Sequence, residues 1–204
     1  MSEIGFYIKE AGELSDDEFN ALRRHYLVYA WAERDEHRNL HRDLDAIYTE
    51  IDGLVARGEL LPIVNSLNTC GRIVIFSTES STLALREFQQ AMLVEDKTVH
   101  LVPEDSPSTA MLDTLTPNDL LIVVTTSNGF ARRQRTVIER CHAYKVIVTA
   151  SEDPALHAIF DDVLAFGKDA DEGSSLHRIY ATFGVTYFFD RLFAQYARAF
   201  DPLL

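Results

Sequence analysis

Residues 120–149 read LLIVVTTSNGFARRQRTVIERCHAYKVIVT, and this stretch decides the predicted fold. It holds two short apolar runs, Leu120 to Val124 and Lys145 to Thr149, on either side of an amphipathic stretch from Ala131 to Ala143. Apolar runs of about five residues without alternation are typical of strands that are buried on both faces. A helix between two such strands implies that they run parallel. The stretch therefore predicts one strand–helix–strand unit of an α/β protein.

The same alternation of apolar runs and amphipathic stretches continues on both sides of this unit. Further strands are predicted at Ile73 to Phe76, Thr98 to Val102 and Asp162 to Phe166, and further helices at Ser81 to Leu93, Ala110 to Leu115 and Leu176 to Phe200. The chain is therefore expected to form an α/β, doubly wound fold with a five-stranded parallel sheet flanked by helices.

The first 58 residues differ from the rest because their apolar residues follow a helical period. Ser15 is followed three residues later by Glu18, which is the pattern of a capping box at the start of a helix. Apolar side chains then recur at spacings of three and four. We expect an N-terminal helical extension over residues 1–58, and a sheet domain over residues 59–204 that opens with a short helix from Leu60 to Leu67.

Composition excludes several classes of function. The chain has 204 residues, 47% of them apolar, which fits one buried domain with an extension. Its net charge of −13 repels nucleic-acid phosphates, so we expect no DNA binding by this chain alone. No apolar run approaches the roughly 20 residues of a membrane-spanning helix, and no secretory signal is present. We therefore expect a cytoplasmic protein that does not contact a membrane.

Metal or cofactor binding is not expected. Cys70 and Cys141 form no C-x-x-C pair, which argues against a zinc site and a disulfide framework. A repeat with a spacing of four holds possible metal ligands at Glu33, His37, His41 and Asp45. Arginines at positions 34, 38 and 42 accompany them, however, and such alternation is typical of a solvated helix with ion pairs.

Two loops rich in hydroxyl groups follow predicted strands. Ligands of open parallel sheets bind beyond the carboxyl ends of the strands, at the point where the winding reverses. The loop after the first strand begins FSTESST at Phe76, and the loop after the third strand reads TTSN at 125–128. Hydroxyls near the start of a helix favour an anion. The predicted ligand-binding residues are Ser80, Ser81, Thr125, Ser127 and Asn128.

Arg132, Arg133 and Arg135 follow the second loop and allow two interpretations. Cations in the first turn of a helix oppose its dipole by about 0.3 to 1 kcal/mol each, and a bound phosphate would offset this cost. Alternatively, the hydroxyls only cap the helices, and the arginines face solvent and pair with neighbouring acids. The sequence leaves both interpretations open.

Three segments carry a resemblance to a known family. They are GRIVIFSTESSTLALREFQQAML from Gly71, TLTPNDLLIVVTTSNGFARRQRTVIERCHAYKVIVTASEDP from Thr114, and SSLHRIYATFGVTYFFDRLFAQY from Ser174. In this order they resemble a sugar isomerase (SIS) domain, with its flavodoxin-like sheet, and in particular the effector domain of RpiR-type transcription regulators. The phrase Leu-Thr-Pro-x-Asp at 115–119 is typical of that family. The resemblance implies that the two loops bind the phosphate of a phosphosugar.

The loops depart from the pattern of the family. Ser77 and Glu79 stand where glycines are usual, which removes backbone freedom and adds a negative charge. Thr125 and Ser127 are acceptable replacements for two serines, whereas Phe130 stands where a threonine hydroxyl is expected. We therefore expect either a remodelled loop or a ligand other than a standard phosphosugar.

The N-terminus and the resemblance together define the functional hypotheses. The segment from Phe6 to Leu27 resembles the end of the family's helix-turn-helix domain, although it also fits an unrelated helical arm. The leading hypothesis is a phosphosugar-sensing effector domain of an RpiR-type regulator that lacks most of its DNA-binding domain. The alternatives are a degenerate SIS protein retained for dimerisation, and a phosphosugar aldose–ketose isomerase with Glu172 and His177 as catalytic candidates.

The last predicted helix is apolar over more than one face. Such a helix is buried, either in the core of one chain or partly against a second subunit. Because SIS domains pair, we expect a homodimer or a higher homo-oligomer that binds a phosphorylated sugar or a related small anion.

Overall fold

The structure is a computed structural model, and it describes residues 15–17, 19–20, 23, 27, 40–167 and 183–203. The chain divides into two compact units, residues 1–43 and 44–204. In the first unit, the backbone N–H of Phe19 donates to the carbonyl oxygen of Ser15 at 2.9 Å, which is one turn of helix. The expected capping partner Glu18 lies outside the described residues.

The second unit contains a five-stranded sheet in which every pair of neighbouring strands is parallel. The strands are β1 (Ile73–Ser77), β2 (Val99–Pro103), β3 (Leu120–Thr125), β4 (Tyr144–Thr149) and β5 (Asp162–Ala165), in the order β2-β1-β3-β4-β5. Every residue of β1 and β3 is buried. The five-stranded parallel α/β fold predicted from the sequence is confirmed.

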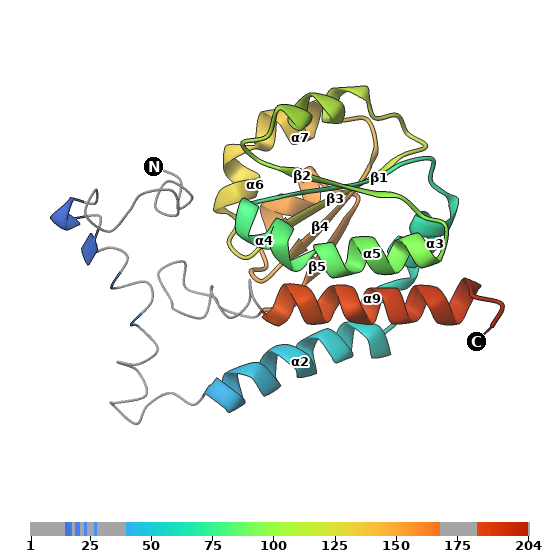
Figure 1. Ribbon diagram of the computed structural model, residues 1–204, viewed down its shortest axis with the longest axis horizontal. Coiled ribbons are helices and arrows are strands. Elements are labelled where there is room, and N and C mark those ends of the chain that lie inside the picture. The colour runs from blue at the N-terminus through green and yellow to red at the C-terminus, as the bar shows by residue number, and fades with distance from the viewer. Residues whose placement is uncertain are drawn as a thin grey trace. The chain divides into compact units, whose positions relative to one another are not determined.

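One face of the sheet is covered by short helices (Figure 1). They are the 3-10 helix η3 (Pro107–Thr114), α6 (Gly129–Arg133), α7 (Arg135–Arg140) and the 3-10 helix η4 (Pro154–Ala158). Val74 and Phe76 of β1 belong to the apolar core on this face, together with Ile138 of α7. The sequence predicts one continuous helix here, whereas the structure breaks it at Gln134, where φ is −92° and ψ is 8°.

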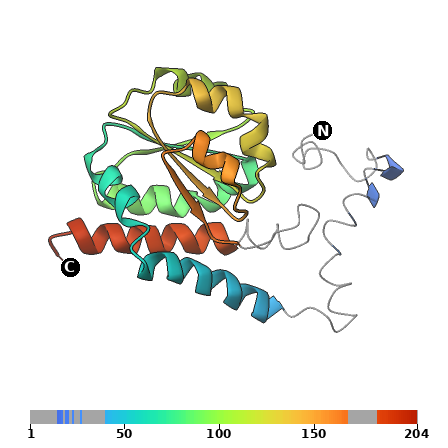
Figure 2. The same ribbon diagram turned by 180° about the vertical axis from the view of Figure 1, so that it is seen from behind.

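The opposite face is covered by four helices, α3 (Leu61–Thr69), α4 (Glu79–Ala84), α5 (Arg86–Val94) and α9 (Val185–Phe200), as Figures 1 and 2 show. The helix predicted from Ser81 to Leu93 is divided at Leu85, which is fully buried. The short helix predicted near Leu60 to Leu67 is confirmed as α3. The part of the last predicted helix that precedes residue 183 lies outside the described residues.

From Leu44 onward, helix α2 (Leu40–Ala56) packs on α9 on the side away from the sheet (Figures 1 and 2). Asp52 accepts hydrogen bonds from the Tyr187 hydroxyl at 3.1 Å and pairs with Arg191 at 2.8 Å. The rings of Tyr48 and Tyr187 have their centroids 4.5 Å apart. From Leu44 onward this helix therefore belongs to the same compact unit as the sheet, while a domain boundary near residue 58 stays a prediction.

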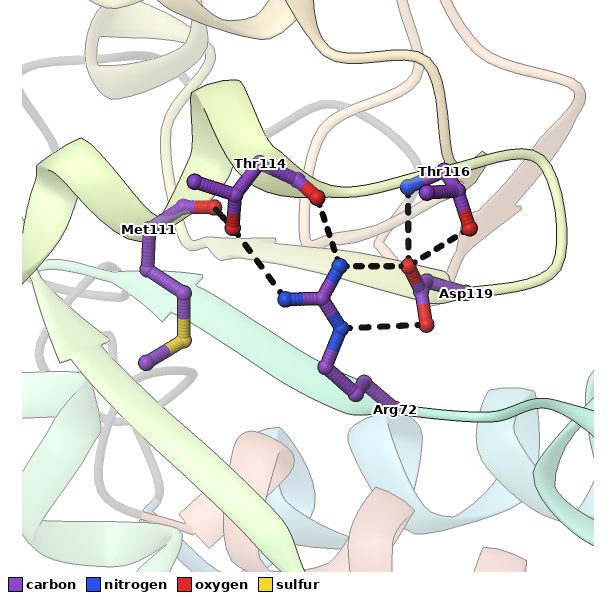
Figure 3. Close-up of polar contacts among 5 residues, drawn as sticks. All are labelled: Arg72, Met111, Thr114, Thr116 and Asp119. Carbon is purple, nitrogen blue, oxygen red and sulfur yellow. Dashed lines mark hydrogen bonds and ion pairs between the residues drawn. The ribbon is translucent and has the colours of Figure 1, made fainter.

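A buried carboxylate joins the amino ends of β1 and β3 (Figure 3). Asp119 precedes β3 and is 5% exposed, and its two oxygens lie 3.2 and 2.8 Å from Nε and Nη2 of Arg72, which precedes β1. The backbone N–H and the hydroxyl of Thr116 also donate to Asp119, at 2.8 and 2.9 Å. Arg72 further donates to the carbonyl oxygen of Thr114 at 2.6 Å.

This contact explains the Leu-Thr-Pro-x-Asp phrase at 115–119. The guanidinium of Arg72 holds the pKa of the Asp119 carboxyl well below its usual range, and the hydrogen bonds from Thr116 act in the same direction. Both residues lie at the amino ends of the strands, opposite the edge where the hydroxyl loops begin. We conclude that the Leu-Thr-Pro-x-Asp motif has a structural role and does not contact a ligand at those loops.

None of the helices in the described ranges combines the length and the apolarity that crossing a bilayer requires.

Candidate functional site

The two hydroxyl loops leave neighbouring strands at the same edge of the sheet. β1 pairs in parallel with β3, and Ser77 lies beside Val124 at the carboxyl ends of the two strands. After β1 the chain enters α4 on one face of the sheet, and after β3 it enters α6 on the other face (Figure 1). This edge is therefore the point where the winding reverses, which is where open α/β sheets bind ligands.

Hydrogen bonds between side chains order the loop after β1. Thr78 caps α4, because its Oγ1 accepts from the backbone N–H of Ser81 at 3.5 Å, and it also donates to the Ser81 hydroxyl at 3.2 Å. The hydroxyls of Ser77 and Thr82 lie 2.8 Å apart. Ser77, Ser81 and Thr82 are buried, whereas Glu79 is exposed. Ser80 lies in α4, and its side chain is outside the described part of the structure.

The loop after β3 is tied to the loop after β4. The buried side chain of Asn128 donates from Nδ2 to the carbonyl oxygen of Ser151 at 3.0 Å, and its Oδ1 accepts from the Thr149 hydroxyl at 3.1 Å. Thr125 Oγ1 donates to the carbonyl oxygen of Ser127. Thr125 is buried, and Ser127 is half-buried. Among the predicted site residues of this loop, Ser127 therefore has the most accessible side chain, while Thr125 and Asn128 hold the backbone in place.

Phe130 contributes to the core and not to the loop surface. Its ring packs against Phe76 of β1 with centroids 5.0 Å apart, and both rings are buried. The hydroxyl that the family pattern has at this position is thus replaced by an apolar contact with the sheet.

The three arginines after the loop all form ion pairs. Arg132 contacts Asp153 at 3.3 Å, and Arg133 contacts Glu104 at 3.1 Å. Arg135 contacts Glu139, one turn later in the chain, at 2.8 Å. Pairing with neighbouring acids was one of the two interpretations from the sequence, and the structure favours it for these residues.

Two of these acids nevertheless lie at the carboxyl edge of the sheet. Glu104 directly follows β2, and Asp153 follows β4 and caps η4. The backbone N–H of Ala155 lowers the pKa of the Asp153 carboxyl, and Arg132 lowers it further. Neither acid was predicted as a site residue from the sequence. The available signal was the position of Glu104, two residues after the strand predicted at Thr98 to Val102.

The catalytic candidates Glu172 and His177, like Glu33 and His37 of the possible metal repeat, lie outside the described residues. Within the described ranges, no group of three or more His, Cys, Asp or Glu side chains is placed to hold a metal ion.

No family model matches the sequence, and no curated protein matches it. Solved structures do. NanR of Vibrio vulnificus, in complex with ManNAc-6P, has a TM-score of 0.62 and 14% identity, over 90% of this chain and 69% of that one. The sugar isomerase domain of an RpiR transcription factor from Sphaerobacter thermophilus has a TM-score of 0.54 and 16% identity, over 85% of this chain and 91% of that one.

A third structure is a hypothetical protein of Methanococcus jannaschii with an inferred function of 3-hexulose-6-phosphate isomerase. It has a TM-score of 0.56 and 12% identity, over 76% of this chain and 88% of that one. At such identities the similarity establishes the fold. The SIS-type architecture expected from the sequence is therefore confirmed.

Proposed function

We propose that this chain binds a phosphorylated sugar or a related small anion at the carboxyl ends of β1 and β3. The observation that carries the proposal is the convergence of the two hydroxyl loops at the point where the winding of the sheet reverses. Hydroxyl groups offer hydrogen bonds to phosphate oxygens without adding charge. The TTSN loop provides the half-buried Ser127, and the loop after β1 provides the half-buried Thr78.

Three of the predicted residues have a positioning role in this proposal. Ser81, Thr125 and Asn128 are buried and already hydrogen-bonded within the loops. Loops that are held in place before binding lose less conformational freedom when the ligand arrives. Ser80 remains a predicted ligand residue, on the basis of its place in the first turn of α4.

The biological role that we propose is that of an effector domain of a transcription regulator. Its support is the SIS fold shared with NanR and with the RpiR transcription factor. We expect a homodimer in the cytoplasm, in which ligand binding changes the contacts between subunits. With a net charge of −13, the chain by itself is expected to leave DNA unbound.

Binding can be tested with the 204-residue chain. We expect ManNAc-6P or another hexose 6-phosphate to raise the melting temperature, because a ligand at 100 times its Kd stabilises the folded state by about 2.7 kcal/mol. For a domain of this size, that corresponds to a shift of about 5 to 10 °C. The unphosphorylated sugars should have no effect. A panel of sugar phosphates that leaves the melting temperature unchanged would contradict the proposal.

A pair of variants places the site. Ser127→Ala should weaken binding by about 10- to 100-fold, because it removes a hydrogen bond to a charged group that is worth about 1.5 to 3 kcal/mol. The matched control is Ser66→Ala in α3, since the Ser66 hydroxyl donates to the carbonyl oxygen of Pro62 in the same helix and α3 leads to the amino end of β1. Equal losses of ligand affinity in both variants would show that the ligand does not bind at Ser127.

Two alternatives have specific support. An aldose–ketose isomerase is favoured by the shared fold of the M. jannaschii protein, and it predicts exchange of the C2 proton of a phosphosugar in deuterated water. A degenerate domain kept for dimerisation is favoured by Phe130, whose ring is in the core. It predicts that Ser127→Ala and Ser81→Ala change neither ligand binding nor any other measured property except stability.

A further inference from the structure

An ion pair between Glu104 and Arg133 lies at the same edge of the sheet as the candidate site. Glu104 directly follows β2, and its backbone N–H donates to the carbonyl oxygen of Ser77 at 3.0 Å. Arg133 ends α6, and its Nη2 lies 3.1 and 3.5 Å from the two carboxylate oxygens of Glu104. The Glu104 side chain is 7% exposed and the Arg133 side chain 59%. The Glu104 side chain is thus largely buried, whereas most of the Arg133 side chain is exposed to solvent.

The position of the pair brings the guanidinium to the proposed binding loops. Because β1 lies between β2 and β3 in the sheet, a contact from α6 to the residue after β2 crosses the carboxyl end of β1. A Cβ added to Gly129 would lie 3.6 Å from Nη1 of Arg133 and 3.5 Å from the Ser127 hydroxyl oxygen. Arg133 and Ser127 therefore both lie beside the backbone of Gly129.

We propose that Glu104 is an internal anion that competes with the ligand for Arg133 and thereby sets the affinity of the site. This inference rests on the proposed binding of a phosphorylated ligand. A guanidinium binds a carboxylate and a phosphate with the same planar, paired geometry, so one Arg133 cannot fully satisfy both. A phosphate dianion carries more charge than a carboxylate and draws the exposed guanidinium away. Glu104 then loses its partner, and this loss opposes binding.

Competition for the Arg133 guanidinium and simple repulsion of the ligand by Glu104 predict different results. A carboxylate beside the ligand weakens binding by repulsion whether or not Arg133 is present. Competition for the guanidinium, in contrast, requires Arg133. Double-mutant analysis measures this difference, because residues that act through each other have non-additive effects.

The experiment measures the Kd of ManNAc-6P and of inorganic phosphate by titration calorimetry on the 204-residue chain. Glu104→Gln keeps the size of the side chain and the backbone bond to Ser77, and it should tighten binding by about 5- to 10-fold, as expected for the loss of a partly exposed competing ion pair. The matched control is Glu139→Gln, which makes the same change in charge and removes the partner of Arg135 at 2.8 Å. We expect the control to change Kd less than twofold.

Arg133→Gln should weaken binding, and adding Glu104→Gln to it should give a clearly smaller gain in affinity than Glu104→Gln gives in the wild type. A wild-type chain that binds while Glu104→Gln shows no gain overturns this inference and leaves the proposed function standing. A gain of the same size with and without Arg133 also overturns it, because repulsion alone then explains the effect. Failure of all chains, Glu104→Gln included, to bind either probe overturns both proposals. Equal melting temperatures of the variants without ligand would show that the comparison is between folded proteins.

Discussion

Replacing Asp119 with Asn tests whether the carboxylate at the amino edge of the sheet is a structural clamp. Asp119 accepts two hydrogen bonds from Arg72 and two from Thr116 (Figure 3). An amide of the same shape has only one acceptor oxygen, so one donor of Arg72 or Thr116 faces an NH₂ group. It also removes the charge that strengthens the bonds to Arg72.

The size of the effect follows from the contacts. Hydrogen bonds to charged groups contribute about 1.5 to 3 kcal/mol when one partner is removed. The Arg72 side chain is 37% exposed, so water compensates part of its loss. We therefore expect Asp119→Asn to lower the free energy of unfolding by about 2 kcal/mol, which corresponds to about 4 to 8 °C in melting temperature for a domain of this size.

Urea unfolding monitored by circular dichroism measures this loss at pH 7. The control is Asp113→Asn, since Asp113 pairs with Arg140 at 3.2 Å but is 51% exposed, and we expect it to change stability by less than about 0.5 kcal/mol. If Asp119→Asn lowers the free energy of unfolding no more than the control does, the structural role of the Asp119 carboxylate is refuted.

The pH dependence gives a second test of the same contact. Arg72 lowers the pKa of Asp119 in the folded state, so the unfolded chain takes up the proton more readily. The contribution of Asp119 is therefore fully present above its ordinary pKa of 3.8 and is lost as the pH falls below it. We expect the difference between wild type and Asp119→Asn to shrink between pH 6 and pH 3. If the difference in unfolding free energy stays constant over this range, the ionised carboxylate of Asp119 is not the source of the stabilisation.

Three further substitutions test the loops by urea unfolding. Gly167→Ala should destabilise the chain by more than about 2 kcal/mol, because the new Cβ would lie 2.0 Å from the backbone oxygen of Ala150. Phe130→Thr restores the hydroxyl of the family pattern and should cost about 3 kcal/mol through the lost packing on Phe76. Asn128→Ala should cost about 1 to 2 kcal/mol through its two lost hydrogen bonds, and it should also weaken ligand binding.

Each of these predictions has a contrary result. Normal stability of Gly167→Ala would mean that the backbone at this position yields easily. A stable Phe130→Thr variant would show that the ring contact adds little to the core. Unchanged ligand affinity in Asn128→Ala would mean that the hydrogen bonds of Asn128 do not affect the binding site. It would contradict the positioning role that we propose for Asn128.

Much of the fold was predictable because burial is visible in the sequence. The strands that are covered on both faces consist almost entirely of apolar residues, as LLIVV and KVIVT do, and each of these runs became a strand. The helix divisions at Leu85 and Gln134 were not predictable in the same way. Apolar spacing continues through both positions, so the pattern that marks a helix carries no sign of the break.

The candidate site was predictable in part. The rule that ligands bind at the carboxyl ends of parallel strands placed the two hydroxyl loops together, and the pairing of β1 with β3 does bring them to one edge. The roles within the loops were not predictable. Phe130 and Asn128 both follow the TTS segment, and only their surroundings distinguish a core ring from a side chain that bridges two loops.

The sequence alone determined the parallel α/β architecture, the position of the hydroxyl loops and the acidic charge, because each depends on local composition and period. Only the tertiary structure decided which acids meet which arginines. Glu104 and Arg133 are 29 positions apart in the chain. They meet because β2 and β3, the strands that precede them, lie on either side of β1 in the sheet. Such a pairing depends on the order of strands in space, and hydrophobic pattern along the chain does not record that order.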